Sequence, residues 1–262
     1  MWEIFKAKEL LKKNKTRLTI LIFFIATCIL INVCSKYTNS YENMKIRNEL
    51  LTFYDNVKEE KKETQTSSKI TKLEELQKIN SEIIALIQIE GTNINYPVLQ
   101  GKDNEYYMTH NYKREKTSDG ALFLDAGYSW EIPSTNLLIY GHNNVGSKEM
   151  FADLIKYKSK AFYNKHKIIN FTTNIDDAKY EIISVFLSRV YSKTEKNAFR
   201  YYFFLNADTK EQFDEFIVNC KKVSLYDTGA NVDYGDQLMT LSTCEYSKNN
   251  GRFVVVARRI NE

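Results

Sequence analysis

The sequence predicts a mostly β domain, folded as a largely antiparallel barrel or sandwich, that follows a single transmembrane helix. Beyond about residue 82, eight short apolar runs are bounded by Gly, Asn, Asp or Pro, a pattern typical of strands. Only two helical patterns interrupt these runs, so a doubly wound α/β sheet is disfavoured. An uncharged apolar run near the N-terminus predicts the membrane helix.

The spacing of apolar residues defines the expected elements. We expect strands at 83–89, 96–99, 121–125, 136–140, 168–172, 180–187, 237–243 and 252–259. Helices are expected at 148–157 and 208–222. In the second helix, residues at i, i+3, i+4 and i+7 form one apolar face, namely Phe213, Phe216, Ile217 and Cys220.

Composition limits the classes of protein that the chain can represent. Hydrophobic residues make up 43% of the 262 residues, enough for a packed core, and 9 Gly with 2 Pro exclude collagen-like or Pro-rich architectures. Residues 1–17 carry six positive and two negative side chains, which accounts for the whole net charge of +4. Because the rest of the chain is neutral, net charge gives no support for a nucleic-acid-binding face.

Residues 18–34 form the apolar run, which has no charged residue. A membrane helix needs about 20 apolar residues, with about 17 as the lower limit. A soluble core helix would show a polar stripe, which this run lacks. No A-x-A-like site follows the run and no small residue precedes Cys34, so we favour an uncleaved signal-anchor over a cleaved signal or a lipoprotein. The basic residues before the run predict a cytoplasmic tail at 1–17 and an extracellular remainder.

Residues 35–80 are expected to form a helical stalk, before a barrel domain at 81–262. Thr-Lys-Leu-Glu at 71–74 resembles a capping box that would start the second stalk helix. The charged run 58–68 predicts a weakly structured hinge between the two helices. The apolar residues at helical spacing are Met44, Leu51 and Tyr54 in the first helix, and Ile70, Leu73, Leu76 and Ile79 in the second.

Among the four cysteines, Cys244 is the candidate nucleophile, because it ends an apolar strand and precedes a polar turn. Cys220 lies on the apolar face of its helix and is expected to be a buried thiol. A Cys220–Cys244 disulfide is the alternative for an exported domain. The sequence contains no C-x-x-C pair and no H-E-x-x-H motif, so neither a thioredoxin-like site nor a metal site is expected.

Of the three histidines, His142 also follows an apolar strand. Gly141 before it is expected to permit a sharp turn that leaves the imidazole at the end of the strand. His110 and His166 lie in polar surroundings and are expected to be exposed rather than catalytic. A Cys244–His142 dyad is therefore the candidate catalytic pair, with His before Cys, the reverse of the papain order.

These residues lie in recognisable motifs. Tyr-Gly-His-Asn at 140–143 follows an apolar strand, and Arg252 comes eight residues after Thr-Leu-Ser-Thr-Cys at 240–244. Both motifs resemble those of the sortases, the membrane-anchored cysteine transpeptidases of Gram-positive bacteria. The segments most similar to class B sortases are 91–101, Gly-Ala-Leu-Phe-Leu-Asp at 120–125, Leu-Ser-Thr-Cys-Glu at 241–245 and the helical insertion before the cysteine strand.

The resemblance covers about residues 70–260 and implies an eight-stranded β-barrel with N-terminal helices and no cofactor. It implies that Cys244 attacks the Thr carbonyl of a sorting signal to form a thioester, and that His142 acts as general acid and then base. Arg252 would stabilise the oxyanion, with the Glu245 N–H as a second donor. Two further residues, Ser242 and Asn104, would support the groove. Arg258 and Arg259, farther along the strand, are less suitable cations.

The implied partners are surface proteins that carry sorting signals and an amine of the peptidoglycan precursor, with the membrane bound through the N-terminal helix. Wall anchoring and pilus-type polymerisation both fit this chemistry. An inactive, membrane-tethered sortase-like binding module is the alternative function. The presence of all three catalytic residue types does not favour it.

Overall fold

The computed structural model describes residues 15–35 and 65–260, together with residues 2, 37, 38, 41 and 45. The chain divides into two compact units, residues 1–48 and 49–262. In the first unit, a helix of 21 residues at Lys15–Ser35, with a mean hydropathy of 2.5, is long and apolar enough to cross a membrane. The expected first stalk helix around Met44–Tyr54 and the hinge residues 58–64 lie outside the described residues, apart from helical residue 45.

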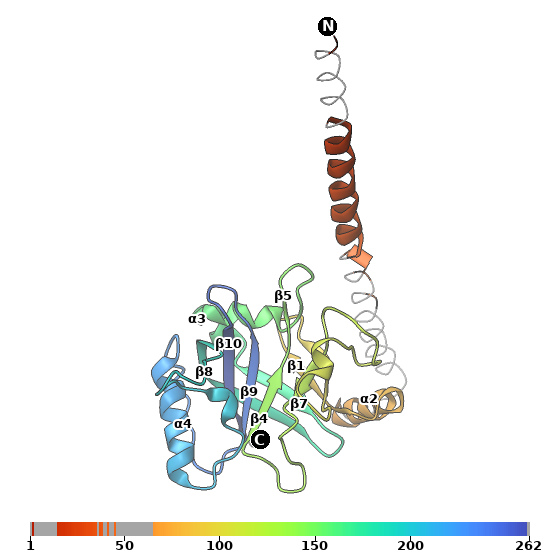
Figure 1. Cartoon of the computed structure of the whole chain (residues 1–262). Helices are drawn as coiled ribbons and strands as arrows, with labels where there is room; N and C mark the ends of the chain where they lie inside the picture. The colour runs from red at the N-terminus through yellow and green to blue at the C-terminus, as the bar shows by residue number, and fades with distance from the viewer. Residues whose placement is uncertain are drawn as a thin grey trace. The chain divides into compact units, whose positions relative to one another are not determined.

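The second unit contains a closed eight-stranded barrel (Figure 1). Its strands are β1 (Ile83–Ile89), β2 (Asn95–Leu99), β3 (Leu122–Leu124), β4 (Asn136–Tyr140), β7 (Ile168–Thr172), β8 (Asp177–Arg189), β9 (Leu238–Cys244) and β10 (Gly251–Ile260). They follow the order β1-β2-β3-β4-β9-β10-β8-β7, and β7 pairs with β1 to close the barrel. Two neighbouring pairs, β2–β3 and β4–β9, are parallel, and the other pairs of the described barrel are antiparallel. The prediction of a mostly antiparallel eight-stranded barrel is confirmed.

Short elements surround the barrel. They are α2 (Gln65–Ile79), the 3-10 helices η1 (Tyr106–Met108), η2 (Ala152–Lys158) and η3 (Tyr201–Phe203), α3 (Lys160–Lys165), α4 (Lys210–Val223), and the two-stranded sheet of β5 (Asn143–Asn144) and β6 (Glu149–Met150). The prediction of a single helix at 148–157 is wrong for its first residues. Lys148 and Met150 have φ angles of 58° and 56°, which a right-handed helix does not accept, and the helical part begins only at η2.

Helix α2 begins at Gln65, earlier than the capping-box pattern predicts. Residues 65–68 of the expected hinge are therefore helical, and Thr71 lies inside the helix instead of capping it. No Gly or Pro interrupts this stretch, so the helix extends through it. Leu73 and Leu76 are buried, and α2 packs on β1.

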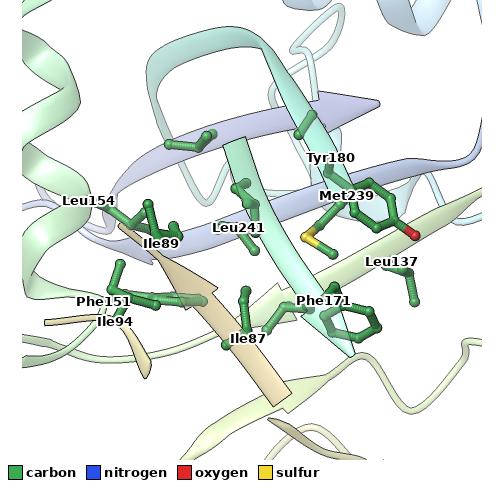
Figure 2. Close-up of a cluster of buried hydrophobic side chains, with 14 of the residues drawn as sticks. Ile87, Ile89, Ile94, Leu137, Phe151, Leu154, Phe171, Tyr180, Met239 and Leu241 are labelled. Carbon is green, nitrogen blue, oxygen red and sulfur yellow. The ribbon is translucent and has the colours of Figure 1, made fainter. Parts of the chain in front are cut away.

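Large aliphatic and aromatic side chains fill the barrel interior (Figure 2). Strand β9 contributes Met239 and Leu241, and the neighbouring β4 contributes Leu137 and Ile139, all at most 2% exposed. Successive side chains of a strand point to opposite faces, so the odd-numbered residues of these two strands face inward. The barrel is a packed core that fixes its strands and leaves the outer face for other contacts.

The even-numbered residues of the same strands face outward. Leu138, Leu238 and Val254 belong to a second buried cluster that α4 covers with Phe213, Phe216, Ile217 and Cys220. The predicted apolar face of α4 is confirmed, including its buried cysteine. Beyond the area that α4 covers, the outward-facing series on β4, β9 and β10 continues to the ends of the strands, where the candidate catalytic residues lie.

Position 141 needs a glycine because the neighbouring side chains leave no room for a Cβ atom. Our expectation that Gly141 permits a sharp turn is wrong. Gly141 is absent from the positive-φ residues of the described chain. A Cβ at this position would lie 2.3 Å from Leu122 Cδ2 and 2.8 Å from Phe151 Cδ2. Because Gly141 has no side chain, its backbone packs directly on the barrel next to His142.

We therefore expect Gly141→Ala to destabilise the fold by about 1–3 kcal/mol, because a methyl group would overpack this contact. Thermal unfolding of the purified protein measures the effect. Gly146→Ala is the matched control, since no heavy atom lies within 4 Å of its Cβ position and its φ is not positive. Equal melting temperatures for the two variants would contradict this account.

Candidate active site

The parallel pairing of β4 with β9 places His142 level with Cys244. The register runs from Asn136 opposite Leu238 to Tyr140 opposite Ser242. The Gly141 N–H continues it by donating to Ser242 O at 3.2 Å. Cys244 ends β9, and His142 lies two residues beyond Tyr140, the last residue of the neighbouring β4.

Arg252 comes from the other neighbour of β9. It is the direct antiparallel partner of Cys244 on β10. Side chains of such partners lie on the same face of the sheet, with Cβ atoms about 4.5–5.5 Å apart. The structure thus brings together His142, just after the end of β4, Cys244 on β9 and Arg252 on β10.

All three side chains line one cleft of about 230 Å³ on the outer face of the barrel. Its floor is the outward face of β4, β9 and β10. One wall comes from the η1 region and the other from the connection between β8 and α4. The remaining lining residues are Asn104, Met108, Phe123, Tyr140, Gly141, Val190, Tyr201, Tyr202, Ser242 and Thr243.

A backbone carbonyl orients the His142 ring. Nε2 lies 2.8 Å from Met108 O. Because a carbonyl only accepts hydrogen bonds, Nε2 carries the proton in this contact, and Nδ1 is left for other chemistry. Within the described residues no hydrogen bond joins His142 to Cys244, an arrangement common in active sites without substrate.

The environments of Cys244 and Cys220 differ sharply. Cys244 is half-buried at the cleft, whereas Cys220 is fully buried on the inner face of α4, and burial raises the pKa of the Cys220 thiol well above its usual value. The four described cysteines are free, so the alternative Cys220–Cys244 disulfide is wrong. Asn143 Nδ2 donates to Cys244 O at 2.9 Å and holds the backbone of the candidate nucleophile. Sequence reasoning missed this role of Asn143.

The turn before β10 anchors Arg252. Nη1 donates to Gly251 O at 3.0 Å and lies 3.4 Å from Asn250 O. The other guanidinium N–H groups make no hydrogen bond to the described part of the chain. The rival cations are engaged elsewhere, Arg258 with Glu181 at 3.0 Å and Arg259 with Asp176.

The backbone N–H and the carboxylate of Glu245 both make hydrogen bonds within the protein, which differs from our expectation. Its N–H, expected as an oxyanion donor, donates to Gly251 O at 3.0 Å. Its buried carboxylate accepts from Lys158 Nζ at 2.9 Å and from the Ser247 N–H at 3.0 Å. The Lys158 and Ser247 hydrogen bonds lower the pKa of Glu245 to about 2. In this structure Glu245 fixes the turn after Cys244 and does not offer its amide to the cleft.

Ser242 and Asn104 line the cleft, and each is hydrogen-bonded to a neighbouring side chain. Ser242 Oγ lies 2.7 Å from Tyr201 Oη, and burial raises the pKa of Tyr201 to about 12, so the phenol stays protonated. Asn104 Nδ2 donates to Asp125 at 2.9 Å, and Tyr140 Oη donates to the same carboxylate oxygen at 3.1 Å. Tyr140 could have been found from the even-numbered series on β4. Tyr201 comes from an irregular connection that carries no periodic signal.

The other two histidines lie outside the cleft. His110 stacks on Tyr106 with ring centroids 4.1 Å apart, and His166 caps the end of α3 against Phe162. No group of three His, Cys, Asp or Glu side chains within the described residues is arranged to hold a metal ion. A thiol, an imidazole and a guanidinium on one surface suit acyl transfer through a covalent intermediate.

Comparisons with known proteins agree with this chemistry. The sortase domain family matches residues 87–260. Sortase B of Staphylococcus aureus is 37% identical over 189 residues, which cover 71% of this chain and 74% of that protein. A crystal structure of a sortase B complexed with triglycine superposes with a TM-score of 0.73 at 30% identity, over 84% of this chain and 98% of that one. The S. aureus sortase B–substrate complex superposes with a TM-score of 0.68 at 31% identity, over 83% and 94%.

The Lys158–Glu245 ion pair predicts an acid-dependent loss of stability. The folded-state pKa of Glu245, about 2, lies below the usual value of 4.5, so the pair stabilises the fold fully above about pH 4.5 and loses this effect as the pH falls toward 2. We expect Lys158→Met to lower stability at neutral pH by about 1 kcal/mol or less, because Lys158 is partly exposed.

Thermal melts from pH 7 to pH 3 measure this effect, and the deficit of Lys158→Met should shrink below about pH 4.5. Lys165→Met, an exposed change on α3, is the control and should track the wild type. A deficit that does not change with pH would argue against the ion pair.

Proposed function

Because the chain belongs to the sortase family of cysteine transpeptidases and is most similar to class B, we propose that it cleaves a C-terminal sorting signal after Thr and transfers the surface protein to an amine of the peptidoglycan precursor. The observation that carries this proposal is the convergence in one cleft of His142, just after β4, Cys244 on β9 and Arg252 on β10. The relatives solved with a substrate and with triglycine support a peptide substrate and a short amine.

In the first half of the reaction, the Cys244 thiolate attacks the Thr carbonyl carbon and forms a C–S bond. The carbonyl electron pair moves to oxygen, where the Arg252 guanidinium stabilises the negative charge. When the carbonyl re-forms, the C–N bond breaks and protonated His142 gives its proton to the leaving amine. The product is a thioester on Cys244 and a released C-terminal peptide.

In the second half, the acceptor amine attacks the thioester carbonyl. Neutral His142 takes the proton that the amine loses as the new C–N bond forms. The C–S bond breaks, its electron pair returns to Cys244 as thiolate, and the surface protein leaves with a new amide bond. The first half-reaction leaves His142 neutral, as the second one requires. The second restores protonated His142 and the Cys244 thiolate, which the first one requires.

The anchored guanidinium of Arg252 is suited to this role. Its contacts with the carbonyls of Asn250 and Gly251 hold the planar group in place before substrate binds. Donors oriented in advance need no reorganisation when the oxyanion forms, and one such donor contributes about 10²–10³ in rate. A lysine ammonium has no fixed fork and would not reproduce this geometry.

The first test uses the full-length protein in detergent with a library of fluorogenic sorting-signal peptides. Cys244→Ala should abolish cleavage, and mass spectrometry should find the acyl adduct on Cys244 of the wild type. Cys220→Ala is the matched control and should keep most activity, because that thiol is buried in packing. An adduct on Cys220, or cleavage by Cys244→Ala, would refute the mechanism. A folded wild type that binds peptides without cleaving them would instead support the inactive binding module.

We also propose that residues 18–34, within the Lys15–Ser35 helix, form an uncleaved signal-anchor, with a cytoplasmic tail at 1–17 and the barrel outside the cell. The support is its length, its hydropathy and the positive charges that precede it. Protease added to intact cells should digest the barrel domain and leave an N-terminal tag protected. Digestion of the tag, or a mature protein that begins after residue 34, would contradict this topology.

A further inference from the structure

A second cleft, of about 600 Å³, lies beside the proposed catalytic residues. The β5–β6 hairpin, η2 and the β9–β10 turn enclose it, with Asn93 from the β1–β2 turn at its edge. Its lining residues are Asn93, Asn143, Val145, Lys148, Ala152, Asp153, Ile155, Lys156, Lys158, Glu245, Tyr246 and Ser247. We propose that this cleft binds the acceptor of the second half-reaction as a short peptide-like amine that carries a carboxylate, with Lys148 as the residue that attracts the carboxylate. The inference rests on the proposed function.

The two clefts meet at the reacting groups. His142 lines the first cleft and the next residue, Asn143, lines the second. In the same way Cys244 lines the first and Glu245 the second. Because one residue spans only about 3.5 Å, an amine at the inner end of the second cleft is close to a thioester on Cys244.

The reaction requires two routes to Cys244. While the thioester exists, the acyl chain of the first substrate occupies the cleft that contains His142 and Arg252. The acceptor must reach the same carbonyl carbon without displacing that chain. The second cleft provides this approach, and the hydrogen bond from Asn143 Nδ2 to Cys244 O at 2.9 Å keeps the junction in place.

The charges of the second cleft favour an anionic group on the acceptor. Lys156 pairs with Asp153 at 2.9 Å, and Lys158 pairs with Glu245 at 2.9 Å. Lys148 pairs with no carboxylate among the described residues, so the cleft keeps a net charge of about +1. This charge attracts a carboxylate and disfavours protonation of a nearby amine, which must be neutral to attack.

The backbone at Lys148 is held firmly. Its N–H donates to Asn144 O at 2.7 Å, and its carbonyl accepts from Asn93 Nδ2 at 3.4 Å. The opposite wall includes Tyr246, whose hydroxyl donates to Asn143 O at 3.0 Å. The backbone of Lys148 therefore has a defined place on the rim, and the far wall is hydrogen-bonded to the residue next to His142.

The experiment measures transfer of a cleavable sorting peptide by the full-length protein to two pairs of acceptors. Triglycine is compared with triglycinamide, and Nα-acetyl-lysine with its amide, so each pair differs only in one carboxylate. Hydroxylamine, which needs no binding site, reports thioester formation separately. We expect Lys148→Glu to raise the KM of the carboxylate form about fivefold or more at low salt, without raising that of the amide. High salt should reduce the difference by screening. Lys222→Glu, an exposed charge reversal on α4, should match the wild type.

Failure of the wild type with hydroxylamine would refute the proposed function itself. Normal trapping by hydroxylamine with no transfer to any of the four amines would overturn the inference alone. Equal KM changes for the carboxylate and amide forms would also overturn it, as would wild-type kinetics in Lys148→Glu.

Discussion

The active site depends on the parallel pairing of β4 with β9. This one register sets His142 level with Cys244, and the antiparallel pairing of β9 with β10 adds Arg252 from the other side. A shift of one residue would turn every side chain of the moved strand to the opposite face. Catalytic geometry is therefore a property of strand register, which the packed interior of the barrel enforces through residues such as Leu137 and Met239.

The two faces of the same strands have different roles: the inner face forms the core, and the outer face contributes to the cleft. Odd-numbered residues of β4 and β9 fill the barrel, while even-numbered residues lie under α4 and then, toward the strand ends, in the substrate cleft. The site therefore needs no separate scaffold. Glu245 and Asn143, which follow Cys244 and His142 in the chain, tie the strand ends to η2 and to each other.

Strand-end positions made much of the site predictable. Cys244 and His142 each follow an apolar run, so both were expected at the edge of the sheet, and the family motifs added Arg252. Contacts between irregular segments could not be foreseen in this way. Tyr201 and the Met108 carbonyl reach the cleft from connections without periodicity. The engaged amide of Glu245 depends on the conformation of a turn, which local composition does not determine.

The pairing of β4 with β9 also has a consequence for the order of events during synthesis. His142 and Cys244 are 102 positions apart in the chain, and Arg252 belongs to the final strand. Bringing such distant segments together is entropically costly and slow compared with the formation of local structure. A nascent or partly folded chain therefore holds its thiol without its imidazole or its cation. The three candidate catalytic residues come together only after the last strand has joined the barrel.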